Sequence, residues 1–119
     1  MAIRRVVPNI DSVDPKASRA FYVDFLGFEV AMDMEWIITF ASPSNPTAQV
    51  NVARADDPTK PLPDLSVEVA DVDAHHARAL ERGLAVVYPL TDEPWGVRRF
   101  FVRDPNGKIV NVVSHRSDA

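Results

Sequence analysis

The chain of 119 residues contains no cysteine, and this absence excludes several kinds of chemistry at once. It rules out disulfide bonds, thiolate ligands for a metal and a cysteine nucleophile. Glycine is also scarce, with four residues, and neither a Gly-rich phosphate-binding loop nor a Gly-x-Ser-x-Gly nucleophile turn is present. Any functional site must therefore use oxygen and nitrogen groups, aromatic rings and apolar surface.

Long hydrophobic runs and an excess of positive charge are missing too. The longest uncharged apolar run, from Trp36 to Ala41, is too short to cross a bilayer, and no apolar signal core follows Arg4 and Arg5. Lys and Arg number 13 against 17 Asp and Glu, a net charge of −4, whereas nucleic-acid binding requires clustered positive charge. We therefore expect a cytoplasmic protein with no membrane or nucleic-acid partner.

The expected secondary structure repeats in the two halves of the chain. In the first half, a strand over residues 3–10 is followed by a helix from Asp14-Pro15 to Gly27 and by strands over 28–33, 35–41 and 48–53. In the second half, a strand over 65–69 precedes a helix from Asp71 to Gly83 and strands over 84–88, 97–103 and 108–113. This repeated β-α-β-β-β order predicts an α+β fold of two modules, about 1–55 and 64–119, with a linker at about 56–63.

The last two expected strands meet at Asp104-Pro105-Asn106-Gly107, whose residue types favour a hairpin turn. Together with Phe25-Leu26-Gly27-Phe28 and Val69-Ala70-Asp71-Val72-Asp73, this turn resembles the pattern of the vicinal oxygen chelate superfamily, also called the glyoxalase, bleomycin-resistance and dioxygenase family. The resemblance covers nearly the whole chain, as a single domain. It implies two βαβββ modules whose mixed sheet curves into a cup that opens to a ligand, with the helices outside. Short members of the family are commonly homodimers.

The metal enzymes of that family take His, Glu or Gln ligands from four positions. The resemblance carries these positions onto Val7, Asn51, Asp64 and Asn111, with one or two residues of uncertainty at Asp64 and with Asn9 as the alternative to Val7. Val7 has no donor atom and the asparagines offer neutral oxygens, whereas zinc, nickel and iron favour imidazole and carboxylate. We therefore expect no catalytic metal and no other cofactor.

Alternation along the expected strands indicates which side chains would line the cup. Parity with Asn111 adds Ile109 and Val113, and the resemblance places Phe101 in the cup, with Arg99 by parity. Ile37 and Thr39 would face the cup in the first half, while Ile38, Phe40, Phe100 and Val102 would pack against the helices. Trp95, in the loop between Pro94 and Gly96, would either stack on a planar ligand or pack on the sheet edge.

The first functional hypothesis is a metal-independent protein, like the bleomycin-resistance branch, that holds an antibiotic or metabolite in the cup. Its candidate ligand-binding residues are Trp95, Arg99, Phe101, Asn51, Asp64 and Asn111, and an inward Arg99 would favour an anionic group on the ligand. The alternative is a lyase, isomerase or dioxygenase of the same superfamily. It would need either a metal bound by Asp64 and amides or acid–base chemistry without metal, with Asp64 or Glu68 as a general base. A further alternative is a ligand-free structural or regulatory subunit.

Overall fold

Two compact units make up the chain in the computed structural model, which describes residues 2–55 and 61–115. We call Val6–Leu62 module one, and Met1–Arg5 together with Pro63–Ala119 module two. Most of the expected linker, residues 56–60, lies outside the described residues. In the part of the chain that the structure describes, no helix is long and apolar enough to cross a membrane.

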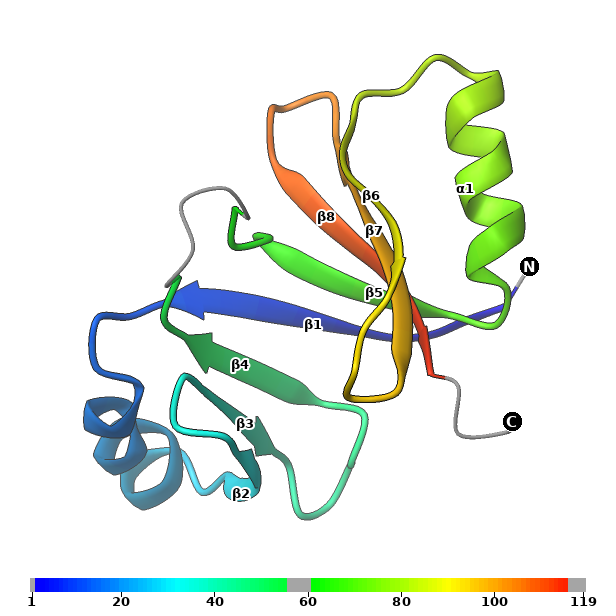
Figure 1. Cartoon of the computed structure of the whole chain (residues 1–119). Coiled ribbons are helices and arrows are strands. Elements are labelled where there is room, and N and C mark those ends of the chain that lie inside the picture. The colour runs from blue at the N-terminus through cyan, green and yellow to red at the C-terminus, as the bar shows by residue number, and fades with distance from the viewer. Residues whose placement is uncertain (1, 56–60, 116–119) are drawn as a thin grey trace. The chain divides into compact units, whose positions relative to one another are not determined.

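Module one is a four-stranded mixed sheet with an irregular helical segment (Figure 1). Its elements are β1 (Ile3–Asp11, whose first residues belong to module two), the 3-10 helix η1 (Pro15–Ser18), the π-helix η2 (Ala20–Phe25), β2 (Glu29–Asp33), β3 (Ile37–Ala41) and β4 (Gln49–Ala53). The strand order is β2-β3-β4-β1, in which β1 is parallel to β4 and the other pairs are antiparallel.

The helical segment of module one differs from the continuous helix that the sequence pattern predicts. The Asp14 side chain makes no capping hydrogen bond, and the chain closes first as a 3-10 turn. The following turn is widened, because the Leu26 N–H donates five residues back to the Phe21 carbonyl. The Tyr22 ring still stacks on Phe40, with 5.1 Å between ring centroids, so this segment covers the sheet as the predicted helix would.

Module two is a second mixed sheet of four strands, covered by a regular α-helix. Its elements are β5 (Leu65–Val69), α1 (Val72–Glu81), β6 (Val86–Asp92), β7 (Val97–Arg103) and β8 (Ile109–His115). The order is β5-β8-β7-β6, with β5 parallel to β8. The Asp71 carboxylate caps α1 by accepting from the Ala74 N–H at 3.0 Å, and Gly83, at φ 67°, follows the helix as predicted. β6 runs further than the predicted strand over 84–88, through two irregularities in its pairing with β7.

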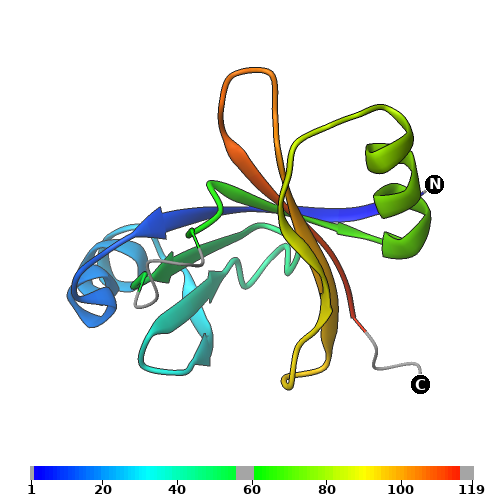
Figure 2. The same ribbon diagram turned by 45° about the horizontal axis from the view of Figure 1, so that its top comes forward.

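The β7–β8 hairpin closes at the predicted turn of residues 104–107, which is the orange loop at the top of Figure 2. Asp104 Oδ1 accepts from the N–H groups of Asn106 and Lys108 at 2.8 and 2.9 Å, and Gly107 takes φ 81°, which glycine adopts without strain. The hydrogen bond from the Lys108 backbone lowers the pKa of Asp104, because it favours the charged carboxylate. The charged carboxylate of Asp104 therefore fixes the backbone of its own turn.

Each module buries one face of its sheet against its own helical segment. In module one the buried core is formed by Ile38, Phe40 and Val52, with Tyr22 and Val23 packed on it. In module two it is formed by Val69, Val72, Ala79, Phe100 and Val112. These cores confirm the predicted strand faces, the α+β class and the repeat of one strand, a helical segment and three strands.

Candidate functional site

The strand faces that point away from the helices carry most of the predicted site residues. In module two, Phe101 on β7 lies opposite Asn111 on β8, and Asn111 lies opposite Ser66 on β5. Arg99 stands two residues before Phe101 and therefore shares its face. The structure thus brings three predicted residues, Arg99, Phe101 and Asn111, onto neighbouring strands of one face.

An aromatic–guanidinium cluster surrounds Arg99 on this face. It consists of Tyr88, Glu93, Trp95, Arg99 and Phe101. The Arg99 guanidinium carbon lies 4.8, 5.2 and 5.4 Å from the ring centroids of Phe101, Trp95 and Tyr88, which is within the range of cation–π attraction. The Tyr88 and Phe101 rings are 4.6 Å apart. The predicted Trp95 therefore lies against the guanidinium of the predicted Arg99.

A buried carboxylate fixes the position of that guanidinium. Arg99 Nε donates to Glu93 Oε2 at 2.7 Å, and the Tyr88 hydroxyl donates to the same oxygen at 2.8 Å. The side chains of Arg99 and Glu93 are 17% and 6% exposed, so water screens this ion pair only weakly. Because Glu93 balances the charge of Arg99, the site does not require an anionic ligand to neutralise it.

Asn111 is buried on the same face and has one unsatisfied polar atom. Its Nδ2 donates to Ser66 Oγ at 3.0 Å. Its Oδ1 is buried and has no hydrogen-bond partner among the described residues. A buried acceptor left unpaired costs about 1–3 kcal/mol. This oxygen is therefore a candidate acceptor for a ligand donor group.

Module one has a closed hydrogen-bonded network at the corresponding place. Thr39 Oγ1 donates to Asn51 Oδ1 at 2.6 Å, and Asn51 Nδ2 donates to Asn9 Oδ1 at 2.9 Å. Asn51 pairs with Thr39 on β3 and with Asn9 on β1, just as Asn111 pairs with residues of β7 and β5. Asn51 therefore has the same strand position as Asn111, but both ends of its amide are satisfied.

The strand pairing indicates different residues from the resemblance at two of the four expected metal-ligand positions. The residues that lie opposite one another on the parallel pairs β1–β4 and β5–β8 are Asn9, Asn51, Ser66 and Asn111. Val7 and Asp64 each stand two residues earlier, so the register favours the alternative at Asn9 and the corresponding alternative at Ser66. A shift of two residues leaves a side chain on the same face of a strand, so alternation cannot detect it.

The two candidate general bases, Asp64 and Glu68, both have partners. Asp64 is exposed, and its Oδ2 accepts from the Ile109 N–H at 2.8 Å, which fastens the start of β8 to the segment before β5. Glu68 bridges Arg5 Nε, at 2.7 Å, and His115 Nδ1. Asp64 thus has a structural contact and lacks the burial that the general-base hypothesis requires, whereas Glu68 has an imidazole partner.

The donor groups at the four register positions do not fit the metal of the family's enzymes. Three are amides and one is a hydroxyl, whereas zinc, nickel and iron sites favour imidazole and carboxylate. These amides are also engaged in hydrogen bonds with one another or with Ser66. Across residues 2–55 and 61–115, no group of three or more His, Cys, Asp or Glu is placed to hold a metal ion. These residues do not support a metal-dependent step.

Three members of the site are not indicated by the sequence pattern. Glu93 lies between β6 and β7, and only its position beside Pro94 and Trp95 marks it. Tyr88 stands at the end of a predicted strand that proves longer. Ser66 alternates with the core-facing Val67 on β5, and this alternation is the one signal that places it on the same face as Asn111.

The fold and these faces define a paired-module α+β protein, in which each module holds polar side chains on the sheet face opposite its helix. The family model described as Glyoxalase/Bleomycin resistance protein/Dioxygenase superfamily matches residues 9–112. The chain belongs to this superfamily, and the resemblance seen in the sequence is confirmed.

Solved structures with the same fold include a member of this superfamily and two methylmalonyl-CoA epimerases. A superfamily member from Vibrio splendidus 12B01 is 21% identical, with a TM-score of 0.69 over 95% of this chain and 99% of that one. Methylmalonyl-CoA epimerase from Mycobacterium tuberculosis is 19% identical, with a TM-score of 0.72 over 98% and 89%. The epimerase of Streptomyces coelicolor, in complex with 2-nitronate-propionyl-CoA, is 19% identical, with a TM-score of 0.72 over 98% and 100%. At these identities the likeness shows the fold alone. No curated protein matches the chain.

Proposed function

We propose that this protein binds a small planar molecule on the helix-opposite face of module two, and that binding needs no catalytic metal. The observation that carries the proposal is the setting of Trp95. Its side chain is 45% exposed, yet its ring lies 5.2 Å from the Arg99 guanidinium, which Glu93 holds in place. A large aromatic ring that is fixed before binding offers a stacking surface at little cost in conformational entropy.

The other proposed contacts share the face of Arg99. Phe101 is 1% exposed and lies 4.8 Å from the Arg99 guanidinium carbon, so its contribution is to position that group. Asn111 has a carbonyl oxygen without a partner among the described residues. Only Nε of the Arg99 guanidinium is engaged with Glu93, so its remaining N–H groups can donate to a ligand carbonyl or carboxylate. In module one both ends of the Asn51 amide are hydrogen-bonded, which argues for a structural role of Asn51, as the backbone contact does for Asp64 in module two.

A thermal-shift screen tests the proposal with bleomycin-type and other planar antibiotics alongside divalent metals. A ligand that binds only the folded state stabilises it by RT ln(1 + [L]/Kd), about 2.7 kcal/mol at 100 times Kd. We expect a shift with a planar compound that is lost in Trp95→Ala and kept in Trp36→Phe, the matched control at the other tryptophan. Equal shifts in wild type and Trp95→Ala, or shifts with metals alone, would contradict the proposal.

The contact between Glu68 and His115 favours one second candidate, an enzyme that transfers protons. With Nδ1 directed at Glu68, Nε2 is the ring atom left to take a proton from a substrate or give one back. Such a step belongs to isomerase or lyase chemistry. Under this reading, the wild type would turn over a compound found in the screen and His115→Gln would abolish that turnover. If the protein only binds, the wild type would show no turnover, and His115→Gln would leave the thermal shift unchanged.

We also propose that the protein is a homodimer, as short members of its superfamily commonly are. Light scattering coupled to gel filtration measures this directly. A mass of about twice the 13.2 kDa of the chain would support the dimer, and a monomer across the micromolar range would exclude a stable one.

A further inference from the structure

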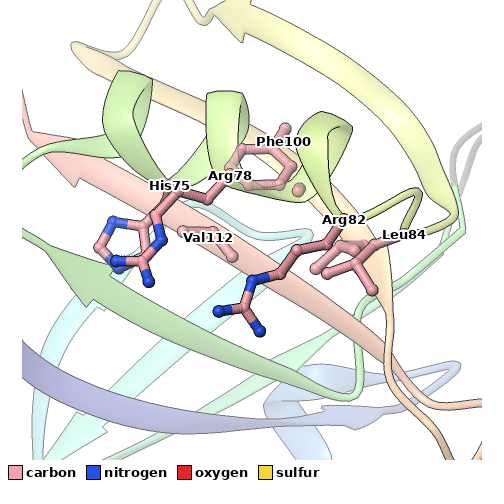
Figure 3. Close-up of a pocket in the computed structure, with 8 residues that line it drawn as sticks. His75, Arg78, Arg82, Leu84, Phe100 and Val112 are labelled. Carbon is pink, nitrogen blue, oxygen red and sulfur yellow. The ribbon is translucent and has the colours of Figure 1, made fainter.

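A pocket lies in module two, between α1 and the sheet face that α1 covers, on the opposite side of the sheet from the aromatic–guanidinium cluster (Figure 3). Its volume is about 370 Å³, at the lower end of the range for small-molecule pockets. The apolar part of its wall includes Leu84, Phe100 and Val112. The pocket is thus a separate feature from the proposed site around Trp95.

Basic side chains form the other part of the wall. His75, Arg78 and Arg82 are spaced three and four residues apart on α1, so they lie along one side of the helix. Figure 3 shows the three side chains extending from α1 toward the same side. The chain as a whole has a net charge of −4, but the described residues that line this pocket include two arginines and a histidine and no carboxylate.

The two arginines differ from the paired arginines elsewhere in the module. Arg5, Arg98 and Arg99 each have a carboxylate partner. Within the described residues, the side chains of Arg78 and Arg82 have no ion pair. Arginine without an internal partner beside apolar surface suits a carboxylate or sulfonate, to which the guanidinium can donate two parallel hydrogen bonds.

We infer that this pocket binds a small amphiphilic anion, a medium-length chain with one carboxylate. The carboxylate would meet Arg78 and Arg82 at the edge of α1, and the chain would lie against Leu84, Phe100 and Val112. The inference is independent of the proposed function, because Phe100 and Phe101 point to opposite faces of β7.

The test is a titration of the full chain with decanoate, below the concentration at which decanoate forms micelles, followed by ¹H–¹⁵N correlation spectra. We expect saturable shifts confined to residues 75–84 and to their neighbours on β7 and β8. Decyltrimethylammonium, which has the same chain length and the opposite charge, should cause no saturable shifts at these residues.

Two double variants separate a specific head-group contact from loss of net positive charge. Arg78→Gln with Arg82→Gln should weaken decanoate binding roughly tenfold or more, because charge-assisted hydrogen bonds are about twice as strong as neutral ones. Both sites are exposed and glutamine is a good helix former, so folding should be preserved. The control, Arg4→Gln with Arg19→Gln, removes the same charge from exposed positions outside the pocket and should leave binding unchanged.

Other results would overturn the inference. These are the absence of saturable shifts, equal binding of the cationic chain, or equal weakening in both double variants. Shifts that centre on Trp95 and disappear in Trp95→Ala would also overturn it, since decanoate would then occupy the proposed site on the other face. If the thermal-shift screen finds no planar ligand, the inference about decanoate is unaffected, because the pocket under α1 is separate from the proposed site around Trp95.

Discussion

Module one and module two place different chemistry at corresponding positions of the same strand arrangement. In module one, Asn51 lies between Thr39 and Asn9, and both ends of its amide are used. In module two, Asn111 has the equivalent position beside Phe101, and its carbonyl oxygen has no partner among the described residues. The amide of Asn51 in module one is fully hydrogen-bonded, whereas the carbonyl oxygen of Asn111 in module two is free, within the described part of the chain, to accept a hydrogen bond.

The difference extends to charge. The module-one network is neutral, whereas module two holds the Arg99–Glu93 pair among aromatic rings. A buried ion pair is costly to desolvate and is weak grounds for stability, so stability alone does not account for the Arg99–Glu93 pair. Two halves with one fold therefore carry different polar faces, one satisfied internally and the other with an acceptor, unpaired among the described residues, beside charged and aromatic groups. This difference is the reason why we propose module two as the ligand-binding half.

The largest expected effect comes from breaking the charged cluster of module two. Arg99→Met leaves the buried Glu93 carboxylate without its guanidinium and should lower the free energy of unfolding by about 3 kcal/mol. Urea denaturation measures this change. Arg99→Met combined with Glu93→Gln should recover most of the loss, because the uncompensated charge is removed. A cost below about 1 kcal/mol for the single variant would mean that the pair behaves like an exposed salt bridge.

A smaller effect distinguishes the two central asparagines. Asn51→Leu removes two hydrogen bonds and takes the acceptor from the buried Thr39 hydroxyl, so it should cost about 2 kcal/mol. Asn111→Leu removes one hydrogen bond together with an unpaired buried oxygen, so it should change stability by less than about 0.5 kcal/mol. Equal costs at the two positions, in the same urea experiment, would remove the contrast between the modules.

The β3–β4 turn of module one and the β7–β8 turn of module two allow a pH test of the same comparison. In module one the Ser42 hydroxyl accepts from the N–H groups of Ser44 and Asn45. In module two the Asp104 carboxylate accepts from the N–H groups of Asn106 and Lys108. Because the pKa of Asp104 is lowered in the folded state, its contribution is fully present above the unfolded pKa and is lost as pH falls through the folded one.

Asp104→Asn should therefore lower Tm at pH 7, and the difference from wild type should shrink as the pH falls below about 4. Ser42→Ala is the matched control at the other turn. The Tm difference between Ser42→Ala and wild type should be the same at pH 7 and below about pH 4, because a serine hydroxyl does not titrate in this range. A difference for Asp104→Asn that persists in strong acid would show that the charge of Asp104 is not what fixes the turn.

A small effect on stability is also expected for Trp95→Ala. Trp95 is 45% exposed and its ring lies 5.2 Å from the Arg99 guanidinium carbon, so the free energy of unfolding should fall by about 1 kcal/mol or less. Calorimetry on the ligand-free protein measures it. A loss of several kcal/mol would indicate that Trp95 is a structural residue of the sheet edge, which is the alternative that the sequence left open.

Alternation and turn chemistry predict much of this structure. The neighbours Phe100 and Phe101 face the core and the opposite side as expected, because residues next to each other on a strand point to opposite faces. The 104–107 turn is predicted because Pro, Asn and Gly each suit a turn for a separate reason. These are local properties, and local properties can be read from a single chain.

The parts that could not be predicted depend on pairing between distant residues. The register that matches Asn9 with Asn51 differs by two residues from the alignment through Val7, and a shift of two keeps the same face. Glu93 reaches Arg99 because β6 continues to Asp92 through irregular pairing, which has no periodic signal. The widened turn after Ala20 also has the apolar spacing of an ordinary helix.

The central claim is that Trp95 in module two is the platform on which a small molecule binds. Trp36→Phe leaves Trp95 as the single tryptophan, so its fluorescence can be titrated with the compound that gives the largest thermal shift. We expect saturable quenching or a spectral shift of the Trp95 emission, with a Kd that matches the Kd from the thermal shift. Saturable binding by calorimetry with no change in Trp95 emission would contradict it.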